Sequence, residues 1–162
     1  MADPIADVAA YDFLSSYQQR AMDQDGCFVV ENALPPDTVA EIDAAIDEVY
    51  EREQRAGRLP DGGRLNMRNC VTQHDAFLQL IDWPTTFPKA MGILNWNIHL
   101  ITSHLLVLPS REAPEEPLRV GLHRDGGTSA REMAEPHPRI LFKIGYVISD
   151  QSDPASGATV VV

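Results

Sequence analysis

Apolar residues recur at helical spacing in two stretches near the N-terminal end of the chain. The first stretch, residues 12–24, precedes Gly26 and has its apolar positions at Phe13, Leu14, Tyr17 and Ala21. The second begins at Pro35-Pro36-Asp37, where proline and an acid suit a first helical turn, and ends at Gly57. It carries an apolar stripe opposite a row of acids, and the stripe consists of Val39, Ile42, Ile46, Val49 and Tyr50. This pattern predicts an amphipathic helix that packs against a sheet.

The later part of the chain is rich in residues that favour strands. A long β-prone run covers residues 97–108, and shorter runs follow at 119–125, 140–149 and 158–162. One further short β-prone run, residues 27–31, lies between the two predicted N-terminal helices. Between the two kinds of sequence we expect a loop at 58–69 and short helices at 75–82 and 84–94. Helices come first and strands after, which favours a mainly β domain with flanking N-terminal helices. We therefore predict one domain over residues 1–162, with a helical part at 1–95 and a β core at 96–162.

Composition and charge narrow the class of protein. The chain is 44% hydrophobic, as in a globular core, and has no apolar run of the roughly 20 residues that would cross a bilayer. Its first residues carry acids instead of the positive charge of a signal peptide, and Cys27 and Cys70 form no disulfide or metal pattern. We expect a cytoplasmic protein without a membrane partner. A net charge of −11 without a basic cluster also argues against a nucleic-acid partner.

The most informative motif is His123-Arg124-Asp125. On a strand, residues two apart point to the same side, so His123 and Asp125 can converge on one metal ion. Two histidines and a carboxylate hold non-haem Fe(II) and leave coordination positions open for oxygen chemistry. A His hydrogen-bonded to a nearby Asp is the structural alternative. The kinase catalytic loop also contains His-Arg-Asp, but it requires Asn five residues later, where this chain has Ala130.

The surrounding sequence resembles the phytanoyl-CoA dioxygenase family. The segment 25–39 (DGCFVVENALPPDTV) is similar to the entry segment of that family, a DG-(F/Y)-VV-type strand before a proline-capped helix. His123-Arg124-Asp125 looks like the family's HxD motif. Residues 142–150 and 157–162 are similar to its late strands. The resemblance extends from about residue 11 to the end of the chain.

This resemblance implies a double-stranded β-helix (jelly-roll, cupin-like) and an Fe(II)- and 2-oxoglutarate-dependent dioxygenase. The cofactors would be Fe(II), 2-oxoglutarate as co-substrate and O₂, and the activity would be hydroxylation of a small molecule. His123 and Asp125 would be the metal ligands. The family's distal iron His and its 2-oxoglutarate-binding Arg are expected beyond Val162, so we expect the last strands to be missing and residues 1–162 alone to be inactive. The alternative is a catalytically inactive jelly-roll binding module that lacks the distal ligand. The substrate and the oligomeric state are left open.

Two further residues are candidates for the site. Lys143 interrupts a β-prone run and shares a side with Leu141, Gly145 and Val147. If that side faced the interior, the ammonium group would need an anion, and the 2-oxoglutarate carboxylate is one. Lys143 is therefore the candidate cofactor-binding residue, with a solvent-facing lysine as the alternative. Of the remaining histidines, at positions 74, 99, 104 and 137, His104 is the best placed for a third ligand.

Overall fold

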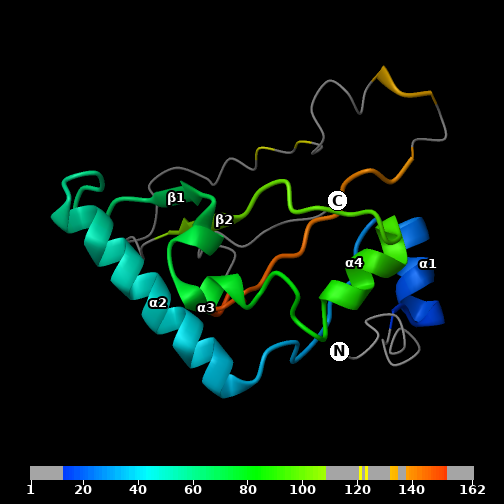
Figure 1. The fold of residues 1–162 in the computed structure, drawn as a ribbon, viewed down its shortest axis with the longest axis horizontal. Coiled ribbons are helices and arrows are strands. Elements are labelled where there is room, and N and C mark those ends of the chain that lie inside the picture. Colours follow the sequence, from blue (N-terminus) through cyan, green and yellow to red (C-terminus); the bar gives the residue numbers. More distant parts are fainter. Residues whose placement is uncertain (1–12, 109–120, 122, 124–131, 135–137, 153–162) are drawn as a thin grey trace, which may run out of the picture. The chain divides into compact units, whose positions relative to one another are not determined.

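The computed structural model describes residues 13–108, 121, 123, 132–134 and 138–152 (Figure 1). These residues fall into two compact units. The first draws on Met1–Ala33, Asp82–His99 and Asp125–Ile144, and contains helices α1 (Ser16–Gln24) and α4 (Phe87–Leu94). The second draws on Leu34–Ile81, Leu100–Arg124 and Gly145–Val162. It contains α2 (Pro36–Arg55), β1 (Leu65–Arg68), a 3₁₀ helix (Cys70–Thr72), α3 (Asp75–Leu78) and β2 (His104–Val107).

The first unit is held together by caps and by hydrogen bonds between distant segments. Ser15 and Gln18 form a capping box that begins α1, since each side chain accepts from the other residue's backbone N–H. The indole N–H of Trp83 donates to the carbonyl oxygen of Ala33 at 2.8 Å. The Trp83–Ala33 bond connects residues 50 positions apart in the sequence, and Trp83 is half-buried where it makes this bond.

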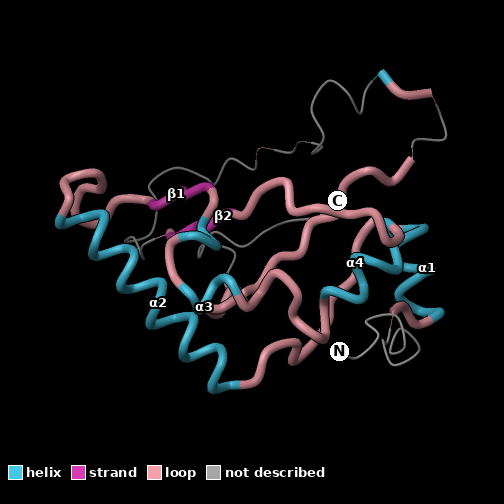
Figure 2. Tube along the Cα trace, in the orientation of Figure 1, coloured by secondary structure: helices cyan, strands magenta, loops and turns pink. Residues whose placement is uncertain are grey.

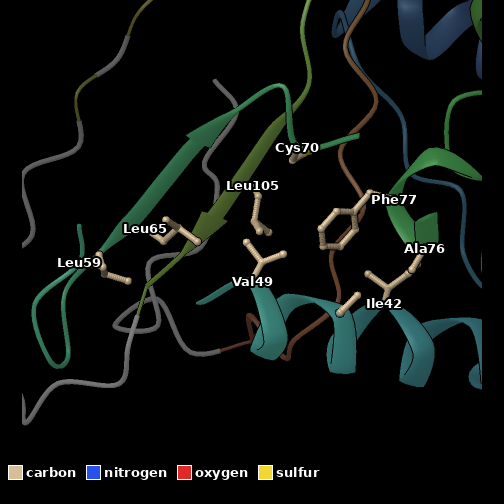
Figure 3. Packing of buried hydrophobic residues seen from close by; sticks show 9 residues of the cluster. Ile42, Val49, Leu59, Leu65, Cys70, Ala76, Phe77 and Leu105 are labelled. Carbon is tan, nitrogen blue, oxygen red and sulfur yellow. The ribbon is translucent and has the colours of Figure 1, made fainter. Parts of the chain in front are cut away.

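The second unit has a hydrophobic core between α2, α3 and the sheet. Figure 3 shows Val49 and Ile42 extending from α2 toward Leu105 and Phe77. Val49 is 1% exposed and Ile42 2%. The rest of the buried cluster consists of Ala45, Leu59, Leu65, Cys70 and Ala76. The predicted apolar stripe of α2 therefore does pack against a sheet, as its spacing indicated.

The sheet consists of two antiparallel strands. Leu65 lies opposite Val107 and Met67 opposite Leu105, and these pairs face the core. Asn66 opposite Leu106 and Arg68 opposite His104 are exposed. Because side chains alternate across a strand, the two strands share one inner and one outer face.

The predicted fold class is wrong. In place of a mainly β, jelly-roll domain, the part of the chain that the structure describes forms four α-helices and one sheet of two strands (Figure 2). Only 104–107 of the β-prone run 97–108 is a strand, and residues 27–31 and 140–149 are in no strand. The physical reason is that β-propensity describes a side chain's fit to a pleated surface, whereas a strand needs a second segment to supply its hydrogen bonds.

The loop predicted at 58–69 is partly wrong for the same reason, since its last residues form β1. The predicted helices are confirmed, with shorter bounds at α1, α3 and α4. The predicted strand at 158–162 and most of the one at 119–125 lie outside the described residues. The prediction of a single domain stays a prediction. None of the described helices is long and apolar enough to cross a lipid bilayer.

Candidate functional site

His123 is held by its own backbone. Its Nδ1 lies 3.0 Å from the carbonyl oxygen of Gly121, and the side chain is exposed. In the tautomer with the proton on Nδ1, the ring donates to this carbonyl, and the lone pair is then on Nε2. Metal-binding histidines commonly donate their second ring N–H to a backbone carbonyl in this way, which fixes the tautomer and the ring orientation. The donor chemistry of His123 therefore fits a metal ligand bound through Nε2.

Asp125, the second predicted ligand, lies outside the described residues, as does Arg124. The convergence of His123 and Asp125 on one ion stays a prediction. Among the described residues, no three His, Cys, Asp or Glu side chains gather as a metal site.

The other histidines have different surroundings. His74 accepts a hydrogen bond at Nδ1 from the backbone N–H of Ala76, and its Nε2 lies 3.5 Å from Glu48. It caps a helix. His99 is exposed, and His137 is outside the described residues. His104, the predicted third ligand, lies on the outer face of the sheet opposite Arg68.

Lys143 is exposed. Exposed and half-buried residues alternate from 141 to 148, so Lys143 does share an exposed side with Leu141 and Val147, as the period of two indicated. An anion beside Lys143 was expected only if its side of the segment faced the interior. In the structure that side faces outward. Lys143 and His123 belong to different compact units. Its role toward 2-oxoglutarate stays a prediction.

The polar residues that β1 places on the outer face of the sheet were not predicted from the sequence. Asn66 and Arg68 were assigned to a loop, because Gly62, Gly63 and several arginines surround them. The signal that pointed to them was the short alternation Leu65-Asn66-Met67-Arg68, in which two apolar residues occupy alternate positions. Four residues are too few for this alternation to distinguish a strand from a loop.

One charged cluster in the described residues has a structural role. Glu53 is buried at the end of α2, and two hydrogen bonds from Arg58 hold the pKa of its carboxyl below the ordinary value, against the opposing effect of burial. Arg52 adds a contact at 3.5 Å. The carboxylate is fully paired, so this cluster ties the helix to the turn that follows it.

No family model, curated protein or solved structure matches this chain.

Proposed function

We propose that this protein is a non-haem Fe(II)- and 2-oxoglutarate-dependent dioxygenase that hydroxylates a small molecule and resembles phytanoyl-CoA dioxygenase. His123 and Asp125 are the two protein ligands of the metal in this proposal. The observation that carries it is the hydrogen bond between His123 Nδ1 and the Gly121 carbonyl, in a motif of the family's HxD form. That bond supports a ring oriented to bind metal through Nε2.

Each residue has a defined role in the proposal. His123 supplies a neutral nitrogen and Asp125 a carboxylate oxygen, a donor set that suits Fe(II). When bound, the metal with 2-oxoglutarate and O₂ supplies the oxidising chemistry. Lys143 would hold a carboxylate of 2-oxoglutarate through its ammonium group. The protein's own contribution is to orient these groups and the substrate.

The test of the metal ligands is an anaerobic titration of the protein with Fe(II), in which calorimetry measures the uptake of metal. His123→Ala and Asp125→Ala should each abolish stoichiometric uptake, while circular dichroism shows an unchanged helix content. His99→Ala, which removes another exposed histidine, is the matched control and should bind as the parent does. Full uptake by either ligand variant would disprove the assignment of His123 and Asp125 as metal ligands.

The role of Lys143 has a separate test. Lys143→Met should weaken the binding of 2-oxoglutarate to the Fe(II)-loaded protein by about tenfold, as the loss of a charge-assisted hydrogen bond predicts. Fe(II) uptake itself should not change. An unaltered 2-oxoglutarate affinity would leave Lys143 as a surface residue.

The proposal includes a cytoplasmic location. Cys27 and Cys70 are both free thiols, Cys27 exposed and Cys70 buried in the core. Free thiols persist in the reducing environment of the cytoplasm.

A further inference from the structure

The outer face of the sheet combines positive charge, an amide and an apolar side chain on a fixed backbone. Its four paired residues are Asn66 opposite Leu106 and Arg68 opposite His104. All four are exposed, and Leu106 is 54% exposed. Opposite side chains on an antiparallel pair have Cβ atoms about 5 Å apart, so Arg68 and His104 can contact the same small group.

The backbone beneath this face is held firmly. Beyond the Arg68–His104 pair, the N–H of Asn69 donates to the carbonyl oxygen of Ser103 at 2.7 Å, and the N–H of Val71 donates to the Ser103 hydroxyl at 3.3 Å. On the inner side, Leu65 and Leu105 belong to the buried core. The outer side chains therefore project from a platform whose position is set by packing, which lowers the entropic cost of holding a ligand.

The Arg68 guanidinium forms no hydrogen bond or ion pair with any described residue, and the same is true of the His104 ring. Three of the five described arginines of the second unit differ in this respect, since Arg52, Arg55 and Arg58 each lie within 4 Å of a glutamate carboxylate. Arg68 instead lies opposite a histidine, whose ring N–H can donate a second hydrogen bond to an anion that Arg68 binds.

We propose that this outer face binds the carboxylate of a small organic acid that has an apolar body. The Arg68 fork matches a carboxylate in a bidentate arrangement, His104 and Asn66 can add hydrogen bonds, and Leu106 contacts the apolar part. The four residues include no acid, although the whole chain carries a net charge of −11. A carboxylate is therefore repelled by the protein in general and attracted at this face. A second copy of the chain fits less well, because pairing two such faces would bring their arginines together.

The experiment is an NMR titration of the metal-free protein with hexanoate, read at the backbone amides of β1 and β2. An open face without enclosing walls predicts a Kd on the order of 1 mM. Arg68→Ala should weaken hexanoate binding by at least about tenfold. Arg68→Lys keeps the charge but loses the bidentate guanidinium geometry, so its affinity for hexanoate should lie between those of the parent and Arg68→Ala. Arg55→Ala, which removes an exposed arginine from the end of α2, is the matched control and should bind as the parent does. Hexylamine, with the opposite charge, should not bind.

Three results would overturn the inference. They are the absence of shifts at residues 66–68 and 104–106, equal effects of Arg68→Ala and Arg55→Ala, and equal binding of hexanol, which lacks the charge. Concentration-dependent dimerisation that covers the same amides and excludes hexanoate would also overturn it. The titration contains no metal, so its outcome is independent of the test of His123 and Asp125.

Discussion

Arg58 donates two hydrogen bonds to the Glu53 carboxylate, from Nε to Oε2 at 2.6 Å and from Nη2 to Oε1 at 2.8 Å. The backbone also connects the two residues, because the N–H groups of Arg58 and Leu59 donate to the Glu53 carbonyl oxygen. Between the two residues, Gly57 has a φ of +70°, in the left-handed region that glycine adopts without strain. Side chain and main chain together close the C-terminal end of α2.

Removing the Arg58 side chain should destabilise the protein. Arg58→Ala leaves the Glu53 carboxylate, 7% exposed, without its main partner, and we expect a measurable loss in the free energy of unfolding. Arg55→Ala is the control, since its contact with Glu51 is at 3.9 Å between exposed side chains and should contribute less than about 0.5 kcal/mol. Urea unfolding measures both. Equal losses in the two variants would contradict the assigned role of the pair.

The same pair predicts a pH dependence. The pKa of Glu53 is lowered in the folded state, chiefly by the hydrogen bonds from Arg58. The folded state thus favours the charged form, and the stabilisation is complete above the ordinary glutamate pKa of about 4.3. It is lost as the pH falls through the lowered value. The stability difference between the parent and Glu53→Gln should therefore be constant from pH 7 to 5 and shrink on further acidification, as urea unfolding at each pH will show.

His74 should stabilise α3 as a cap. Its Nδ1 accepts from the N–H of Ala76 at 3.1 Å, in the place where helices usually carry Ser, Thr, Asp or Asn. His74→Ala should cost about 1 kcal/mol, whereas His74→Asn, which keeps a short acceptor, should retain most of the stability. Thermal unfolding distinguishes the two variants. A Tm of His74→Asn as low as that of His74→Ala would show that the ring contact with Phe77 matters more than the cap.

Leu105 and Leu106 offer a matched pair on the two faces of β2. Leu105 is 8% exposed and belongs to the core, while Leu106 is 54% exposed on the outer face. Leu105→Ala should destabilise the protein by about 2–5 kcal/mol, and Leu106→Ala by less than about 0.5 kcal/mol. Chemical unfolding of both variants checks the register of the strand. A larger loss for Leu106→Ala would mean that β2 presents its other face to the core.

Some of this structure could be predicted from local sequence. The stripe that includes Ile42 and Val49 recurs at the period of a helix, and a helix forms its own hydrogen bonds within the segment. The position of α2 and its buried face therefore required no knowledge of other segments. The period of two around Lys143 was also correct, and the structure confirmed which residues share its side. Which side would be exposed did not follow from the pattern.

The strands and the outer face of the sheet required the tertiary structure. A β-strand takes its hydrogen bonds from another segment, and β1 and β2 are separated by 35 residues in the sequence, so neither can be recognised from its own four residues. The sequence alone determined the amphipathic helices and the HxD motif, because both depend on residues a few positions apart. The packing of distant segments decided the fold class and the pairing of Arg68 with His104, since the free energy of those contacts exists only when the two strands meet.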